Sequence, residues 1–388
     1  MNIPLEIKSW TVERRREFHR YPEPSWHEVK TAARIEQILG ELGIETRRVA
    51  GTGVIGQLRG GQPGKTVGLR ADIDGLQQHE ETGLPFASEN PGFMHACGHD
   101  AHIAMLLGAA KLLAERASSL PGRVLFLFQP AEELCQGAKA MIEAGALEGV
   151  HAVFGIHVWS ALPAGKVSIE PGPRMASADI FKITFKGKGG HGSAPQEGVD
   201  TIVPAALTVL GLQSIVCKEL DARKPVVLNV GQIHGGTRFN VIADETTIDG
   251  SVRCFDPEVQ DLIEEKVRRV ARLTAEAHRA TVELEYSRAC PVTVNDPGLT
   301  ELAQRVARRE LGEACLACLE PVTGSEDFSF YASKVPATYA FLGVGNKAKG
   351  TTYPQHHPCY DIDEDVLEYG VKLHVAFAEA FLRGENSV

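Results

Sequence analysis

Residues 124–133 form the stretch VLFLFQPAEE, and this stretch decides what kind of fold to expect. Its first five residues are all apolar, and a short apolar run of this kind is typical of a strand buried in a parallel sheet. Two carboxylates, Glu132 and Glu133, follow the run. In open sheets of parallel strands, ligands bind outside the carboxyl ends of the strands. The stretch therefore predicts a parallel sheet with a polar site at one edge.

Two other segments repeat this pattern of an apolar strand that leads into polar side chains. TVGLRADID (66–74) ends with Asp72 and Asp74, and VFGIHVW (153–159) carries His157 near its end. Apolar residues at helical spacing, as in AHIAMLLGAAKLLAERA (101–117), separate the strands. Strands alternating with helices indicate an α/β fold with an open, mostly parallel sheet.

The pattern changes after residue 176. DIFKITFKGKG (179–189) alternates polar and apolar residues, as a half-exposed antiparallel strand does. The elements expected next are a helix, two strands, a helix and a strand, near 201–220, 226–234, 246–254, 259–277 and 281–286. This β-α-β-β-α-β order is that of a ferredoxin-like sandwich. We therefore expect one domain made of residues 1–176 and 290–388, with an inserted ferredoxin-like α+β domain at 177–289.

Composition excludes several classes of protein. The 388 residues include 50 acidic and 40 basic side chains, and a formal net charge of -10 argues against a nucleic-acid partner. The N-terminus contains no uninterrupted apolar segment typical of a signal peptide. No stretch approaches the ~18 apolar residues that span a bilayer. Eight cysteines in a chain of this length do not suggest a disulfide framework. We expect a cytoplasmic protein with no membrane partner.

The segment MHACGHDAH (94–102) places three histidines, a cysteine and an aspartate directly before an apolar helix. Buried polar groups cost free energy unless they are paired, and a metal ion is one possible partner. Imidazole, carboxylate and thiolate groups are ligands for zinc, manganese or cobalt. Alternation along an extended chain puts Cys97 and His99 on the same side. Asp100 stands where a helix N-cap is expected.

The tandem pair Glu132-Glu133 permits a division of labour. One carboxylate can ligate the metal while the other takes a proton from metal-bound water, whose pKa the metal lowers to about 7. Each residue also has a simpler interpretation. A single buried histidine is more often a packed core residue, Cys97 alone more often a small buried apolar side chain, and adjacent glutamates are usually solvated. The combination at strand ends favours a metal site.

The chain resembles the M20 metallopeptidases, and within them the amidohydrolases that cleave N-acyl amino acids, such as hippurate hydrolase and the plant auxin-conjugate hydrolases. The matching segments occur in order over nearly the whole chain: RREFHRYPEPSWHE, LRADIDGL, MHACGHDAH, QPAEE, GIHVW, GGHGSAPQEGVD, GGTRFNVIAD, GSEDFSFYA and HHPCYDIDEDVL. The resemblance implies two divalent metal ions per subunit (Mn²⁺, Zn²⁺ or Co²⁺), hydrolysis of the amide bond of N-acyl-L-amino acids, and a homodimer paired through the inserted lid domain.

Carried over residue by residue, the resemblance implies a role for each site residue. The implied metal ligands are Cys97, His99, Glu133, His157 and His356. Glu132 is then the general base, and His191 polarises the scissile carbonyl. The substrate carboxylate is assigned to Asn240, with Arg238 and Arg253. His356 is preferred to His357 because the family pattern is His-x-Pro.

The chain departs from the wider family at two places. Many M20 peptidases begin the site with His-x-Asp, where this chain has Asp72-x-Asp74. Arg238 stands where a small residue is expected, which would alter the substrate preference. Three alternatives remain: a dipeptidase or carboxypeptidase using the same two-metal site, a metal-independent thiol hydrolase using Cys97 with His99, and a non-catalytic binding protein, in which Glu132 would have no use.

Overall fold

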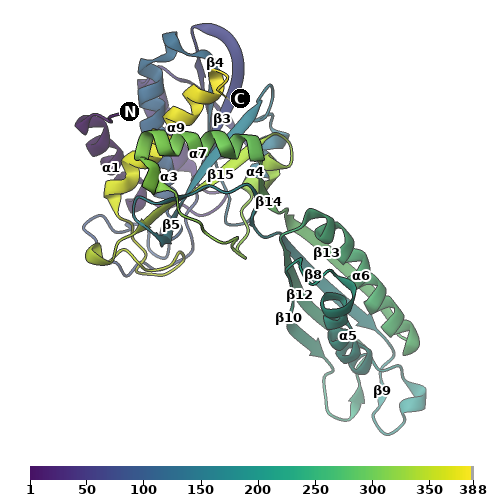
Figure 1. Ribbon diagram of the computed structural model, residues 1–388. Coiled ribbons are helices and arrows are strands. Elements are labelled where there is room, and N and C mark those ends of the chain that lie inside the picture. Colours follow the sequence, from purple (N-terminus) through teal and green to yellow (C-terminus); the bar gives the residue numbers. More distant parts are fainter. Residues whose placement is uncertain (386–388) are drawn as a thin grey trace. The chain divides into compact units, whose positions relative to one another are not determined.

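The computed structural model describes residues 1–385, which fold as two compact units (Figure 1). The first unit comprises Met1–Arg174, Val294–Glu320 and the chain from Asp327 onward. The second comprises Met175–Thr293 and Pro321–Glu326. The expected insertion at 177–289 lies within the second unit.

The second unit is larger than the expected insertion, because it also takes in a short segment from late in the sequence. The backbone N–H of Ala176 donates to the carbonyl oxygens of Val322 and Gly324, over 3.1 and 2.9 Å. Nη1 of Arg253 donates to Oγ of Ser325 over 2.7 Å. These hydrogen bonds attach the segment to the second unit, and nothing in its own sequence indicates them.

A seven-stranded sheet forms the centre of the first unit, and its middle is parallel as predicted. The strand order is β1-β2-β4-β3-β5-β15-β6. Strands β4, β3, β5 and β15 run parallel to one another, while β1 and β2 on one side and β6 on the other pair antiparallel. The bounds are Glu45–Val49 (β1), Gly53–Arg59 (β2), Gln62–Asp72 (β3), Pro121–Gln129 (β4), Ala152–Pro163 (β5), Val167–Ser168 (β6) and Ala337–Gly345 (β15).

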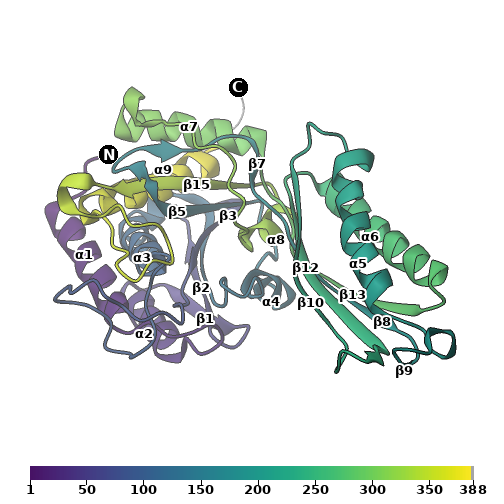
Figure 2. The ribbon, with the colours of Figure 1, turned by 90° about the horizontal axis from the view of Figure 1, so that it is seen from below.

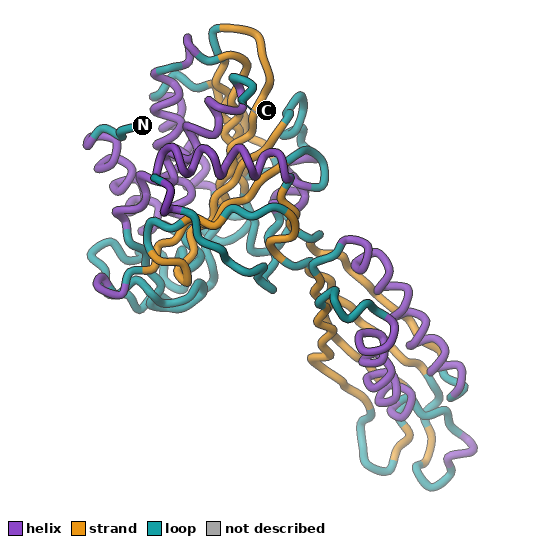
Figure 3. The backbone as a smooth tube through the Cα atoms, viewed as in Figure 1, coloured by secondary structure: helices purple, strands orange, loops and turns teal. Residues whose placement is uncertain are grey.

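Helices flank this sheet, as the purple and orange segments of Figure 3 show. They are α1 (Leu5–Arg20), α2 (Val29–Glu41), α3 (His99–Glu115), α4 (Gly137–Glu143), α7 (Pro297–Leu311), α8 (Phe328–Ala332) and α9 (Leu367–Leu382). Helices α3 and α9 contact each other and β3, and α1 and α7 pack on their outer sides. Almost every residue of α3 is buried, including His99, Asp100 and His102 in its first turn, so the helix has no solvent-exposed face. Helix α9 was not among the predicted elements.

The second unit has the element order predicted for 177–289. Its sheet, ordered β10-β12-β8-β13, is antiparallel throughout, and α5 and α6 lie on the same face of it (Figure 2). The bounds are Ala178–Lys186 (β8), Ile202–Ser214 (α5), Val226–Gly235 (β10), Glu245–Cys254 (β12), Pro257–Ala277 (α6) and Thr281–Cys290 (β13). A small ladder pairs β9 (Gly190–His191) with β11 (Val241–Ile242). Strands β7 (Gly172–Met175) and β14 (Thr293–Asn295) lie at the sequence boundaries of the two units.

Helix α5 differs from the prediction that no stretch could span a bilayer. It continues into a π-helical turn, and Ile202–Glu219 is, by length and composition alone, apolar enough to cross a membrane. The helix packs Ala205 and Leu212 into the core of the second unit. Only 28% of the window is buried, and Leu210 is 69% exposed. The helix therefore belongs to the folded unit but leaves an apolar face uncovered within residues 1–385.

Candidate metal centre

Neighbouring strands of the first sheet bring polar side chains to one edge, as the sequence predicts. Strand β3 ends at Asp72, β4 leads into Glu132 and Glu133, and β5 carries His157. Parallel strands present their carboxyl ends at the same edge, so these segments meet there. The loop before α3 adds Cys97 and His99.

The side chains form three overlapping clusters of candidate ligand atoms, each with its atoms within 4.8 Å of one another. The clusters are Cys97–His99–His157, His99–Glu132–Glu133 and Cys97–Glu133–His356. Sγ of Cys97 lies 3.5 Å from Nε2 of His157, and Nε2 of His356 lies 3.6 Å from Oε1 of Glu133. The structure thus brings together all five predicted ligands and Glu132, and the overlapping clusters supply more donors than one ion needs.

The hydrogen bonds of two histidines direct one ring nitrogen of each toward this cluster. Nδ1 of His99 donates to the carbonyl oxygen of Asp74 over 2.9 Å, and Nδ1 of His157 donates to that of Val158 over 2.7 Å. Each Nε2 is then a lone-pair donor. Nε2 of His99 is buried and makes no hydrogen bond within residues 1–385. A metal-ligating histidine characteristically gives its other N–H to a carbonyl or carboxylate, so both residues fit a metal ion.

His102 also lies in this region, but both of its ring nitrogens make hydrogen bonds within the protein. His102 belongs to a further cluster with Asp72 and His99. Its Nδ1 donates to Oδ1 of Asp72 over 2.5 Å, and its Nε2 accepts the N–H of Val158 over 2.9 Å. Both nitrogens are occupied, so His102 supports the site without a free lone pair for a metal.

The electrostatics of the donors also favour a cation. Burial, with the nearby Glu133 carboxylate, raises the pKa of the Cys97 thiol to about 12. Burial opposes charge on His99, but the carboxylates of Asp72 and Asp74 raise its pKa well above the usual value. Burial lowers the pKa of His157, and His102 lowers it further. A divalent cation would deprotonate a coordinating thiol and pair with the carboxylates. Its charge would therefore balance the buried negative groups of the cluster.

A buried network beneath the site comes from segments far apart in the sequence. Arg70 donates from Nη1 to Asp72 over 2.6 Å and from Nη2 to Asp327 over 3.0 Å. Gln129 accepts from Nε of Arg70 over 2.9 Å and donates to Asp327 over 2.7 Å. Burial raises the pKa of Asp72, but His102, His99 and Arg70 together hold it well below its usual value. The sequence prediction missed this support, although Asp327 lies in the matching segment GSEDFSFYA.

The start of α3 differs from the prediction that Asp100 is its N-cap. The helix begins at His99 after Gly98, whose φ of 86° is left-handed. Asp100 is buried in the first turn, where it accepts from Nε of Arg15 and Nδ1 of His19, each over 2.8 Å. The cap assignment was wrong because the carboxylate pairs with α1 instead of with its own helix.

The two histidines of the HHP segment have different surroundings. His356 adopts a φ of 65° and faces Glu133, with a side chain that is 55% exposed. Nδ1 of His357 accepts the N–H of Cys359 over 3.0 Å, and its ring stacks on Tyr353 at 4.4 Å. The structure thus places His356 in the cluster and ties His357 to its own turn.

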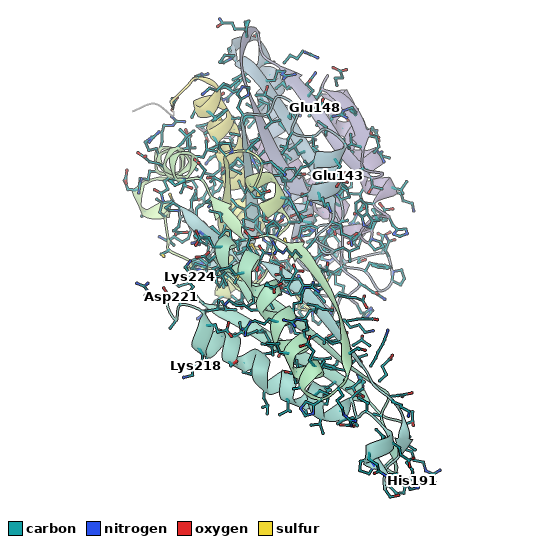
Figure 4. The ribbon with its side chains drawn as sticks, turned by 90° about the vertical axis from the view of Figure 1, so that its right-hand side faces the viewer. Glu143, Glu148, His191, Lys218, Asp221 and Lys224 are labelled. Carbon is teal, nitrogen blue, oxygen red and sulfur yellow. The ribbon has the colours of Figure 1, made fainter. Side chains whose placement is uncertain are left out.

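The remaining predicted residues lie in the second unit. His191 is exposed at the end of this unit that carries the β9–β11 ladder (Figure 4). Its Nδ1 accepts the N–H of Ser193 over 3.1 Å, which places the ring proton on Nε2. Gly192 N–H donates to the carbonyl of Asn240 over 2.9 Å, so Asn240 lies beside His191.

The two predicted arginines lie in different parts of the second unit. Arg238 is exposed on the loop before β11 with its guanidinium over Phe239. Arg253 lies at the other end of β12 and bonds to Ser325. Within this unit the structure brings Asn240 to His191 and leaves Arg253 apart from them.

The sequence matches the family model for peptidase family M20/M25/M40 over residues 68–380, which is most of the chain. The chain belongs to peptidase family M20. Thermostable carboxypeptidase 1 of Saccharolobus solfataricus is 41% identical over 98% of this chain and 97% of that protein. N-acetylcysteine deacetylase of Bacillus subtilis is 39% identical over 92% of both chains.

Among solved M20 structures, YXEP of Bacillus subtilis, described as a dinuclear metal binding peptidase, superposes with a TM-score of 0.87. It is 36% identical, and the match covers 98% of this chain and 99% of that one. Together with the donor set described above, these matches identify this M20 protein as a metal-dependent amidohydrolase.

Proposed function

We propose that this M20 enzyme hydrolyses the amide bond between an acyl group and an L-amino acid, in the manner of an aminoacylase or hippurate hydrolase. The observation that carries the proposal is the place of Glu132. It is 6% exposed, and its carboxylate lies 4.0 Å from Nε2 of His99, in the cluster that also contains Glu133. In this proposal Glu133 ligates the metal, which leaves the Glu132 carboxylate for moving protons.

In this proposal Cys97, His99, Glu133, His157 and His356 hold two divalent ions, which we take to be Zn²⁺, Mn²⁺ or Co²⁺. When bound, such ions supply Lewis acidity, which activates water and polarises the substrate carbonyl. Glu132 accepts the proton of the attacking water and returns it to the leaving amine. His99 and His157 are buried, which strengthens these electrostatic effects.

The second unit contributes the remaining groups. The Nε2–H of His191 is a donor suited to the carbonyl oxygen, since Nδ1 is an acceptor from Ser193. Oδ1 of Asn240 is buried and makes no hydrogen bond within residues 1–385, and its amide N–H groups can bind a carboxylate. Arg238, on the loop before β11, is a cationic candidate for the same substrate group. Arg253 lies apart from Asn240 in the same chain, so we propose it for this role only in a pair of chains, where the second copy can supply it.

We infer that two copies of the chain pair through the second unit. Helix α5 exposes Ile202, Val203, Leu207 and Leu210, and β10 is an edge strand of the sheet. An apolar face of this kind on a folded unit marks an interaction surface, and a two-fold pair would cover the same face on both copies. All eight cysteines are free thiols, which suits the reducing cytoplasm that we propose for this enzyme.

A carboxypeptidase is the second candidate, because the Saccharolobus relative carries that name. A thiol hydrolase using Cys97 is disfavoured, because a thiol with a pKa of about 12 is protonated and a nucleophilic cysteine needs the thiolate.

A substrate panel with metal analysis tests the proposal. Purified enzyme is assayed on N-acetyl-, N-benzoyl- and longer-chain N-acyl-L-amino acids, dipeptides and peptides with a free C-terminus. We expect N-acyl amino acids to be the best substrates and chelation to abolish turnover, with Zn²⁺, Mn²⁺ or Co²⁺ restoring it. Preferential release of C-terminal residues from peptides would favour the carboxypeptidase. Full activity in rigorously metal-free protein would overturn the mechanism.

A further inference from the structure

Strained backbone gathers around the candidate site. Six non-glycine residues among 1–385 have a positive φ, and four of them belong to loops of the site: Trp26 (67°), Ala131 (48°), Cys135 (53°) and His356 (65°). Such conformations cost bulky L-residues free energy and occur preferentially at functional sites. Ala131 and Cys135 shape the turn that carries Glu132 and Glu133, and His356 is a candidate ligand. The mechanism so far gives Trp26 no role.

Three side chains of the Trp26 loop attach it to the Ala131–Gln136 turn. Oγ of Ser25 donates to Oδ2 of Asp74 over 2.7 Å, and the same oxygen accepts the N–H of Glu133 over 3.1 Å. Nε1 of Trp26 donates to Oε1 of Gln136 over 2.9 Å.

The third attachment is the Glu28 carboxylate, which accepts the N–H of Ala131 over 2.9 Å. The indole is thus held at a fixed place beside the turn that carries the proposed base.

The surface presented there is apolar. The one polar atom of the indole is used by Gln136, so the half-buried ring offers its faces and edges. Leu134, directly after Glu133, is 50% exposed on the same turn. An exposed leucine and an anchored tryptophan, both at the turn that carries the two glutamates, are suited to an uncharged, apolar group. The amino-acid half of the proposed substrate carries a carboxylate and needs donors, whereas the acyl half does not.

We propose that Trp26 and Leu134 form a wall that receives the acyl group, so that the enzyme prefers aromatic or extended apolar acyl groups to acetyl. This inference rests on the proposed function. Apolar contacts of this size discriminate between substrates by about 10–200-fold.

The test compares two substrates that differ only in the acyl group, N-benzoyl- and N-acetyl-L-amino acid with the same amino-acid part. In Trp26→Ala the ratio of kcat/KM for benzoyl over acetyl should fall at least ~10-fold. Leu134→Asn, which leaves the tryptophan and its hydrogen bond in place, should lower the same ratio. Ser25→Ala is the matched control: it removes a bond that anchors the loop but keeps the ring, so the ratio should stay near the wild-type value.

A binding measurement adds a readout that does not depend on turnover. The chain has three tryptophans, so fluorescence is titrated with N-benzoylglycine in Glu132→Gln protein with and without Trp26→Phe. N-benzoylglycine should change the fluorescence of the Glu132→Gln protein and leave that of the protein with both substitutions unchanged. An equal change in both proteins would show that the acyl group does not contact Trp26.

An unchanged ratio in both Trp26→Ala and Leu134→Asn would overturn the wall while the proposed function stands. The same drop in Ser25→Ala would show that Trp26 acts only by positioning the loop, which also overturns it. Wild-type enzyme that cleaves no N-acyl amino acid would overturn both proposals.

Discussion

His102 is held by Asp72, with Nδ1 of the imidazole 2.5 Å from Oδ1 of the carboxylate. Asp72 is in turn held by Arg70, and the far nitrogen of His102 accepts the Val158 N–H. The His102 ring lies 4.7 Å from that of His157 at a steep angle. The last histidine of segment 94–102 therefore packs against a neighbouring candidate ligand, His157, and helps to hold it in place.

This relationship predicts different outcomes for two histidines of one segment. His102→Asn should keep the metal content near wild type but lower the free energy of unfolding by about 1–3 kcal/mol, because buried groups of Asp72 and Val158 lose their partner. His99→Asn should lose bound metal. Elemental analysis and urea unfolding measure both effects. A folded His102→Asn protein that has lost an ion would show that His102 is a ligand.

Substitutions of the two adjacent glutamates should likewise have different effects on metal content and on turnover. Glu132→Gln should retain both ions and lose at least ~10²–10⁴-fold in kcat, the usual contribution of a general base. Glu133→Gln should instead reduce metal occupancy, since Glu133 shares clusters with the candidate ligands Cys97, His99 and His356. Each variant is assayed beside its own metal analysis. The reverse pattern would mean that the two roles are exchanged.

Gly98 should tolerate no side chain. A Cβ there would lie 2.4 Å from Cγ2 of Val158 and 2.9 Å from the hydroxyl of Tyr360, and φ is 86°. Gly43 is the matched control, with a φ of 72° and open space around it. Gly43→Ala should cost about 1–2 kcal/mol from the left-handed backbone alone.

Gly98→Ala should cost about 1–3 kcal/mol more than the control, because overpacking is added to the strain. It should also lower metal occupancy, because relief of the clash displaces Cys97 and His99. Equal losses of stability in the two variants, measured by denaturant unfolding, would show that the core yields without moving the ligands.

His374 should make the protein sensitive to acid. Burial lowers its pKa to about 3, and its ring packs edge-on against Phe154. In the unfolded chain a histidine titrates near pH 6.5, at about its ordinary pKa. Between pH 6.5 and 3 the unfolded state therefore binds a proton that the folded state does not, and stability falls as the pH falls.

The slope from this group approaches about 1.4 kcal/mol per pH unit. His374→Leu should remove it, so that the stability difference from wild type shifts in favour of the variant from pH 6 to 4.5. Parallel pH dependence of wild type and His374→Leu in urea unfolding would contradict the assignment.

The proposed pairing predicts complementation between inactive chains. If His191 serves the active site of the partner, a heterodimer of Glu132→Ala and His191→Ala chains contains one site with both lesions and one site with none. Random re-pairing should then recover roughly a quarter of wild-type activity. Mass spectrometry checks that heterodimers form. A mixture that contains heterodimers and stays inactive would show that His191 acts in its own chain.

The parallel strands and the element order of the second unit could be predicted from the sequence, and the resemblance to the M20 family supplied the residues of the candidate metal site. Apolar runs such as 124–128 and polar residues at strand ends follow periodicity and chain direction, which are local properties. The match of short motifs to the M20 family is local as well.

Which polar residues hold the others in place follows from the tertiary structure and not from the local sequence. Asp100 looks like a cap in sequence but pairs with Arg15 and His19 from another helix. Nothing in the sequence around Trp26 indicates a role for it. Its indole N–H donates to Gln136, 110 positions away, and only the folded structure shows this contact. Contacts between residues so far apart in the sequence depend on how helices and strands pack. Because an unpaired buried polar group costs free energy, each one forms hydrogen bonds with the groups that packing places beside it.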